Sequence, residues 1–134
     1  MKEFAIGEIV RAHYNSGTYI GEIIEDRGNR FLVEVLAVVK HPVQGDLHSP
    51  KQVEGVAFHE RKALSYKEKM NAKKPATFKY DEEVPDYADS LKTAVNNIRE
   101  KLEEENSDYS RKALEKIDDL EKHYYNKIYR SVTG

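Results

Sequence analysis

The sequence has no cysteine and no long apolar run, and each absence excludes a class of protein. Without cysteine the chain can form no disulfide, no thiolate nucleophile and no thioether link to a lipid. No apolar run approaches the roughly 18–20 residues that are needed to cross a bilayer. The first ten residues, MKEFAIGEIV, lack the apolar region and the cleavage site of a signal peptide. We therefore expect a soluble cytoplasmic protein, formed by one domain or by a small domain with an appendage.

Catalytic and metal-binding motifs are also absent from the sequence. No GxSxG elbow surrounds a serine, no glycine-rich loop suits a phosphate, and neither HExxH nor a His-x-His pair occurs. A metal site would have to gather His41, His48 and His59 from different loops, together with Asp46 or Glu60. The alternative is that these loop histidines form hydrogen bonds that support the fold. We expect no catalytic residue, no cofactor and no metal.

Basic and acidic residues are distributed unevenly along the chain. Residues 59–80 contain seven Lys or Arg against two Asp or Glu, whereas residues 1–58 contain six against eight. Aromatic residues among basic ones are typical of surfaces that bind single-stranded nucleic acid, and this band contains Tyr66, Phe78 and Tyr80. The other interpretation is a solvated connector whose aromatic side chains dock onto the rest of the protein. We favour the connector, because the β region is acidic and the net charge of the chain is −2.

The first sixty residues follow the pattern of short β-strands. Alternating runs at 8–14, 18–25 and 30–40 are separated by turn residues, and Val56 and Phe58 stand at strand spacing further on. The third run has one wholly apolar face, formed by Phe31, Val33, Val35, Ala37 and Val39. Short strands joined by tight turns favour a small closed barrel, SH3-like as the first choice and OB-like as the second.

The second half follows helical spacing. Ser65 and Glu68 match a capping box, which predicts a short helix that ends before Pro75. Asp86 can cap a longer helix. Two apolar stripes follow at helical spacing, the first formed by Leu91, Val95, Ile98 and Leu102, the second by Ala113, Ile117, Leu120, Tyr124 and Ile128. We expect an antiparallel helical hairpin, and a single long helix through Asn106 agrees with the pattern as well.

These patterns together predict an α+β fold, in which a small SH3-like β-barrel is followed by a helical hairpin. The barrel is expected over residues 1–64, a basic connector with a short helix over 65–85, and the hairpin over 86–134. The tyrosine-rich stripe of the second helix exceeds what one barrel can cover, so a homodimer through the helical part is a further expectation.

Three strings resemble one known family: VLAVVKHPVQGDLHSPKQV, VAFHERKALSYKEK and VPDYADSLKTAV. They are similar to the kinase-associated protein B family of spore-forming Gram-positive bacteria. The resemblance implies an accessory protein, without catalytic activity, of a membrane sensor histidine kinase that feeds the sporulation phosphorelay. Members are often called lipoproteins, but a chain without cysteine is not expected to carry the lipid. Its place would be cytoplasmic, and peripheral to the membrane only through the kinase partner.

The sequence also suggests where a partner would bind. The string HPVQGDLH follows the third predicted strand, and FHERKAL precedes the basic band. Polar residues of these two loops form a candidate recognition patch: His41, Asp46, His48, His59, Glu60 and Arg61. We therefore predict a protein-binding module that activates a histidine kinase pathway. The alternative is a factor that binds RNA or single-stranded nucleic acid through the basic connector and the barrel.

Overall fold

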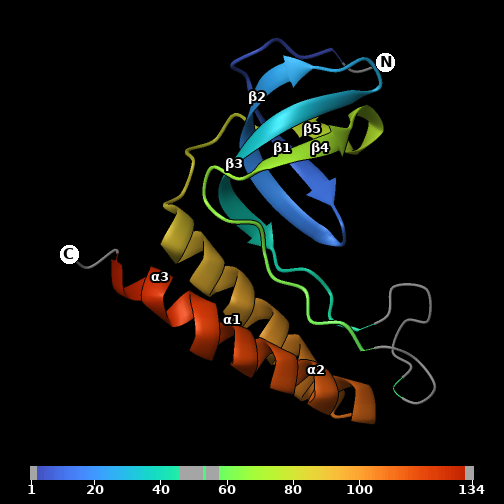
Figure 1. The fold of residues 1–134 in the computed structure, drawn as a ribbon, viewed down its shortest axis with the longest axis vertical. Helices are drawn as coiled ribbons and strands as arrows, with labels where there is room; N and C mark the ends of the chain where they lie inside the picture. The colour runs from blue at the N-terminus through green and yellow to red at the C-terminus, as the bar shows by residue number, and fades with distance from the viewer. Residues whose placement is uncertain (1–2, 46–52, 54–57, 132–134) are drawn as a thin grey trace.

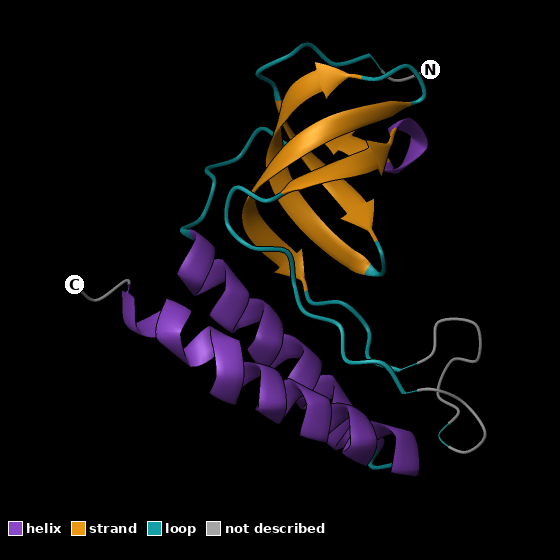
Figure 2. Ribbon diagram, in the orientation of Figure 1, coloured by secondary structure: helices purple, strands orange, loops and turns teal. Residues whose placement is uncertain are grey.

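A curled antiparallel sheet forms one half of the molecule, and helices form the other (Figures 1 and 2). The computed structural model describes residues 3–45, 53 and 58–131. Within these residues the sheet has five strands in the order β4-β3-β2-β1-β5. The strands are β1 (Ile9–Tyr14), β2 (Gly17–Asp26), β3 (Arg30–Lys40), β4 (Lys69–Lys73) and β5 (Thr77–Lys79). The α+β prediction is confirmed, whereas the SH3-like character of the sheet and the domain boundaries stay predictions.

The tight turn between β1 and β2 is the one that the sequence predicted. Asn15 and Ser16 both adopt positive φ, at 45° and 67°, as a two-residue hairpin turn requires. The turn pairs Tyr14 with Gly17 and fixes the register of both strands. Val10 and Ala12 of β1 are therefore buried on the same face of the sheet.

The last part of β3 departs from the predicted alternation. Val39 was expected on the apolar face, but it is 40% exposed, while Val38 is 3% exposed. The cause is an irregularity in the pairing with β2, where Thr18 pairs with Lys40 and Tyr19 with Val38. One extra residue on β3 reverses the alternation beyond it. The prediction for Val39 is wrong for this reason.

The short helix predicted after Ser65 is also wrong. The Glu68 carboxylate does accept from the Ser65 N–H at 2.8 Å, but it closes a turn that leads into β4. Met70 and Ala72 of β4 are buried at alternate positions, which is a strand pattern. A single 3₁₀ turn, Lys74–Ala76, then connects β4 to β5. The predicted connector thus supplies two strands of the sheet. Val56, which was expected in a strand before the connector, lies outside the described residues.

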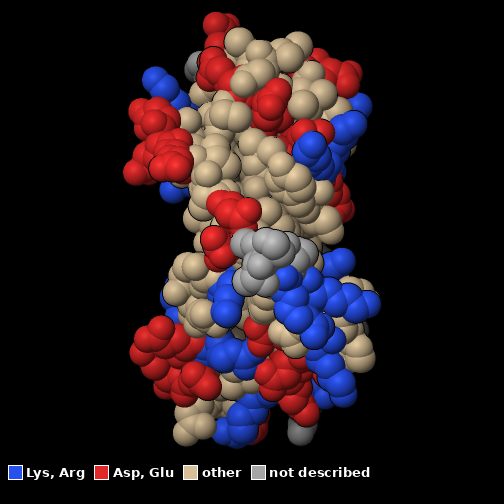
Figure 3. Space-filling model, turned by 90° about the vertical axis from the view of Figure 1, so that its left-hand side faces the viewer, with Lys and Arg blue, Asp and Glu red and all other residues tan. Residues whose placement is uncertain are grey.

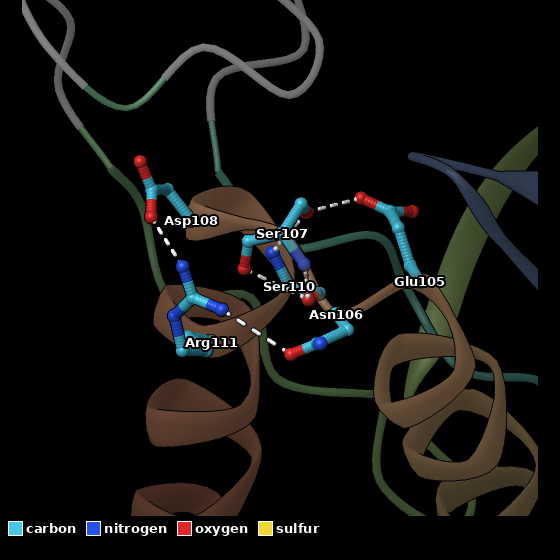
Figure 4. Close-up of polar contacts among 6 residues, drawn as sticks. All are labelled: Glu105, Asn106, Ser107, Asp108, Ser110 and Arg111. Atoms are coloured by element: carbon cyan, nitrogen blue, oxygen red, sulfur yellow. Dashed lines mark hydrogen bonds and ion pairs between the residues drawn. The ribbon is translucent and has the colours of Figure 1, made fainter.

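The helical half is a hairpin, which decides between the two arrangements that the sequence left open. Its helices are α1 (Tyr87–Glu105), α2 (Asp108–Leu120) and α3 (Asn126–Ser131), with a π-helical turn, η2 (Glu121–Tyr125), between the last two. As predicted, the Asp86 side chain caps α1, accepting from the Asp89 N–H at 3.2 Å. Figure 4 shows the hairpin turn, where Asn106 adopts φ 47° and Ser107 caps α2 by a reciprocal pair of bonds with Ser110.

The π-helical turn changes which tyrosine is buried. Tyr124 was expected in the apolar stripe, but it is 45% exposed, and Tyr125 is fully buried instead. A π-helical turn contains one more residue than an α-helical turn, so it rotates the following side chains around the helix axis. Ala113, Ile117 and Leu120, which precede the turn, are buried as predicted.

One hydrophobic core joins the sheet to the helices. Leu91 and Val95 of α1 are fully buried and belong to the same cluster as Val33 and Val35 of β3. At the irregular end of β3 the Val38 N–H donates to the Ser90 hydroxyl of α1 at 2.9 Å. This bond satisfies a backbone group that the disturbed strand pairing leaves without a strand partner.

Candidate functional site

Two extended segments, residues 41–45 and 58–64, run side by side after β3 (Figure 1). The Gly45 N–H donates to the His59 carbonyl at 2.9 Å. The side chain of Gln44, which is 2% exposed, extends this pairing. Its amide donates to the Arg61 carbonyl at 2.9 Å and accepts from the Arg61 N–H at 2.8 Å. The Gln44 side-chain amide thus satisfies the backbone N–H and carbonyl of Arg61, as a neighbouring strand would do.

Four buried tyrosines attach the two segments to the sheet and the helices, and we call them the tyrosine clamp: Tyr19, Tyr87, Tyr109 and Tyr125. The Tyr87 hydroxyl donates to the Leu64 carbonyl, and the Tyr19 hydroxyl accepts from the Leu64 N–H at 3.3 Å. The Tyr109 hydroxyl donates to the Gln44 carbonyl at 2.9 Å. Hydroxyls from both halves of the molecule therefore hold the same two segments.

The fourth member, Tyr125, is bonded to His41. The His41 Nδ1 lies 2.9 Å from the Pro42 carbonyl, and its Nε2 lies 2.7 Å from the Tyr125 hydroxyl. A carbonyl can only accept, so Nδ1 carries the proton and Nε2 accepts from Tyr125. The Tyr125 oxygen in turn accepts from the Ala63 N–H at 2.9 Å. This chain of bonds satisfies each polar atom of the His41 side chain, which is 1% exposed.

Burial fixes the protonation state of this pair. It lowers the pKa of His41 from its ordinary value of 6.5 to about 4, because the charged imidazolium would lose its hydration. It also raises the pKa of the Tyr125 hydroxyl. Both groups are neutral at pH 7, which suits a structural bond and leaves His41 without the charge that a surface recognition residue would offer.

The structure describes four of the predicted recognition residues, and their exposure differs. His41 is buried, His59 and Glu60 are exposed, and Arg61 is half-buried. The Arg61 guanidinium donates to the Gly45 carbonyl and, at 3.4 Å, to the Val43 carbonyl. Asp46 and His48 lie outside the described residues. Within the described ranges no three His, Asp or Glu side chains come close enough to hold a metal ion.

An open groove of about 980 Å³ lies between the two halves of the molecule. It is lined by β3, by the turn before β4, by the start of α1 and by α3, through Leu36, Ser65, Tyr66, Val84, Pro85, Asp86, Tyr87, Ala88 and Ile128. Most of these side chains are apolar or aromatic. Such a lining offers contact area to a partner and no arrangement of nucleophile and base.

Two tyrosines are exposed, one in the lining of the groove and one on the helical segment before Ile128, and the sequence patterns did not predict the exposure of either. Tyr66 is 53% exposed and lines the groove, and its ring centre lies 5.9 Å from that of Tyr87. Tyr124 is 45% exposed, one helical turn before Ile128 of the groove. The sequence places Tyr66 in the basic band without indicating its exposure, and helical spacing predicts Tyr124 in the buried stripe. No sequence signal identifies Gln44 as the residue that joins the two segments.

Comparisons with known proteins agree with this architecture. Residues 14–125 match the model of a family described as kinase associated protein B. The chain is 47% identical over 127 residues to kinase-associated lipoprotein B of Bacillus subtilis (strain 168), a match that covers 95% of this chain and 99% of the relative. A crystal structure of kinase-associated protein B from Bacillus cereus superposes with a TM-score of 0.77 at 37% identity, covering 91% of this chain and 98% of that one.

Within the residues that the structure describes, none of the helices combines the length and the apolar character that a membrane span needs. Close matches in sequence and in structure, each over nearly the whole chain, agree with the family model. The chain belongs to the kinase-associated protein B family.

Proposed function

We propose that this protein is a non-enzymatic accessory factor of a sensor histidine kinase pathway that feeds the sporulation phosphorelay. It acts by binding another protein, either the kinase itself or a component of its pathway. Family membership supports an association with a kinase, since the relatives are named for it. The protein would be cytoplasmic and would reach the membrane through its partner.

The observation that carries this proposal is the open groove between the sheet and the helices. Its apolar lining and the exposed ring of Tyr66 suit a protein partner, because tyrosine is enriched at the centres of protein interfaces. The buried titratable pair, His41 and Tyr125, is fully occupied by its own hydrogen bonds. Binding therefore suits the described residues better than acid–base chemistry does.

An accessory protein can raise the output of a kinase only if it binds the active conformation more tightly than the inactive one. The exposed members of the predicted patch, His59 and Glu60, together with half-buried Arg61, would extend this contact away from the groove. Alanine substitution at His59 and Glu60 would then weaken partner binding without loss of stability, because both side chains are exposed.

The direct test is calorimetric titration of the full chain with the cytoplasmic portion of a candidate sensor histidine kinase. Saturable binding, accompanied by a change in the rate of kinase autophosphorylation, is the expected result. The absence of binding to a folded and active kinase would remove the direct role. Binding without any change in autophosphorylation would contradict the activator role and would indicate that the protein acts as a scaffold for the kinase.

Binding to single-stranded nucleic acid finds less support. Two of the aromatic residues that could stack on bases, in the predicted basic connector, already contact other groups of the protein. The Phe78 ring centre lies 5.6 Å from the His13 ring centre and 5.7 Å from the Arg11 guanidinium carbon. The Tyr80 hydroxyl donates to the Glu83 carbonyl at 2.8 Å. A steep loss of affinity with rising salt, measured with an oligonucleotide, would favour this alternative.

A further inference from the structure

The exposed rings of Tyr66 and Tyr124 are each in contact with a lysine ammonium group. The Lys67 Nζ lies 5.5 Å from the Tyr66 ring centre, and the Lys62 Nζ lies 4.5 Å from the Tyr124 ring centre. Cation–π contacts at exposed sites contribute only about 0.5–1 kcal/mol. They position the two ammonium groups without neutralising them.

We call these four residues the lysine–tyrosine rim: Lys62, Tyr66, Lys67 and Tyr124. Residues 62–67 are one stretch of chain, whose Ser65 and Tyr66 line the groove, while Lys62 lines a smaller hollow with Tyr14 and Pro42. On the helical side Tyr124 is followed one turn later by Ile128, which lines the groove as well. Figure 3 shows lysine and arginine side chains on the helical half, interspersed with aspartate and glutamate side chains.

The two lysines of the rim have no acidic partner within the described residues. Neither Lys62 nor Lys67 is within ion-pair distance of a described carboxylate, whereas Lys74 pairs with Asp26 at 2.8 Å. Two carboxylates near the groove are committed to backbone groups. Asp86 accepts from a helix N-terminal N–H, and Glu68 accepts from the N–H of the turn before β4. Both carboxylates keep their negative charge, but neither forms a described ion pair with Lys62 or Lys67, so these two ammonium groups are open to the carboxylates of a partner.

We infer that the lysine–tyrosine rim and the groove bind an acidic segment of a protein partner. The carboxylates of that segment pair with Lys62 and Lys67, while an apolar side chain of the same segment enters the groove against Tyr66 and Ile128. Complementary charge speeds and orients the encounter, and the aromatic rings contribute buried area with little loss of side-chain entropy. The inference rests on the proposed function, in which this partner is the kinase or a component of its pathway.

A second copy of this chain fits the surface less well. In a two-fold symmetric contact the same patch of both copies takes part, so the same uncompensated lysines would be brought to the interface twice. Like charges brought together at an interface oppose association. An acidic partner removes this conflict, and its carboxylates also replace part of the hydration that the lysines lose.

The test compares two charge-reversed variants of the full chain by calorimetric titration with the cytoplasmic portion of the candidate kinase. The first, K62E/K67E, alters the rim. The matched control, K69E/K73E, makes the same change of charge at two exposed positions of β4 that do not line the groove. We expect the rim variant to lose at least about tenfold in affinity, equivalent to 1.4 kcal/mol, and the control to stay within about twofold of the wild type. Binding by the wild type should weaken as salt rises.

A second variant, Y66A, tests the apolar part of the surface independently of charge. It should also weaken binding by about tenfold or more, and its folding is checked by thermal melting, because Tyr66 is largely exposed. If the wild type binds while K62E/K67E and Y66A bind equally well, the docking surface is overturned and the accessory function stands. If the wild type does not bind the kinase at all, the proposed function fails, and the assignment of this surface fails with it.

Two other occupants would also overturn the inference. Sedimentation that shows a dimer in the wild type and a monomer in K62E/K67E would assign the surface to a second copy. Tighter binding to a single-stranded oligonucleotide than to the kinase, lost in K62E/K67E, would assign it to nucleic acid.

Discussion

Tyrosine has opposite roles in two neighbouring regions of this molecule. The four rings of the tyrosine clamp are buried, and each hydroxyl bonds a backbone group of residues 44 or 63–64. Tyr66 and Tyr124 are about half exposed and meet lysines instead. The clamp fixes the chain up to Leu64, and the lysine–tyrosine rim begins within the same stretch. The clamp thus positions the rim. The comparison predicts that substitutions in the clamp lower the free energy of unfolding strongly, whereas substitutions in the rim change it little.

The adjacent pair Tyr124 and Tyr125 gives the sharpest form of this comparison. Tyr125→Ala should lower the free energy of unfolding by about 3–5 kcal/mol, because it removes a fully buried ring and leaves a cavity. It also leaves His41 and the Ala63 N–H without their partner. Tyr124→Ala is the matched control and should change stability by less than about 1 kcal/mol. Urea denaturation measures both, and equal effects would contradict the shift caused by the π-helical turn.

The pH dependence of stability isolates His41. Its folded-state pKa is lowered to about 4 from 6.5 in the unfolded chain, so the unfolded state binds the proton more readily between these values. The stabilisation is present above pH 6.5 and is lost as the pH falls to 4, by about 3 kcal/mol in all. Denaturation at a series of pH values should show this loss in the wild type and a smaller slope in His41→Gln. An unchanged slope would show that His41 titrates normally.

Gln44 tests whether the pairing of the two segments depends on one side chain. Gln44→Ala removes the bonds to the Arg61 N–H and carbonyl and to the Pro42 carbonyl, and should cost about 1–3 kcal/mol. Asn71→Ala is the matched control, because this amide is exposed and should cost less than about 0.5 kcal/mol. A Gln44 variant as stable as the control, in thermal melting, would mean that water replaces the amide.

The smallest effect is expected at the rim. Tyr66→Ala should change the free energy of unfolding by less than about 0.5 kcal/mol, because the side chain is 53% exposed and its hydroxyl forms no described bond to the backbone of the two segments. Tyr87→Ala, beside it in the groove, should cost several times more, since its ring is buried and its hydroxyl holds Leu64. Denaturation curves of the two variants that coincide would remove the distinction between clamp and rim.

Local patterns predicted the parts of the fold that local forces decide. The strand alternation of β1, the turn at Asn15 and Ser16, and the cap at Asp86 follow from steric and hydrogen-bonding preferences of neighbouring residues. The choice between one long helix and a hairpin was open in the sequence. In the structure Asn106 adopts the left-handed conformation and ends α1, and Ser107 caps α2. The residue types at these two positions are compatible with either arrangement.

Other features depend on contacts between distant residues, and the sequence did not predict them. The irregular pairing between β2 and β3 moves Val39 to the surface, and the π-helical turn exchanges Tyr124 for Tyr125. At Ser65 and Glu68 only one of the two bonds of a capping box is described. The residues that follow form β4, which pairs with the edge of β3, instead of a short helix. The pairing of Thr18 with Lys40 and that of Glu34 with Lys69 both lie outside the local sequence window from which the patterns were inferred.

The candidate site was predictable to a similar extent. The structure places residues 41–45 and 58–64 side by side outside the strands and helices, while the recognition patch stays a prediction; the sequence left open a hydrogen-bonding role for the loop histidines. The burial of His41 depends on Tyr125, which is 84 positions further along the chain. The exposure of Tyr66 and Tyr124 depends equally on how the two halves pack. Residue type alone could not separate a tyrosine of the clamp from one of the rim.

The position of β5 has a consequence for how the chain assembles. β1 lies between β2 and β5, and its residues Val10 and Ala12 pair with Lys79 and Thr77. Such pairing between distant parts of the sequence closes a long loop and is slow, whereas the helical hairpin is built from neighbouring residues. β1 can pair with β2 across a two-residue turn, but it obtains its second neighbour only after residues 77–79 have been added. The helical hairpin depends on no partner so distant in the sequence.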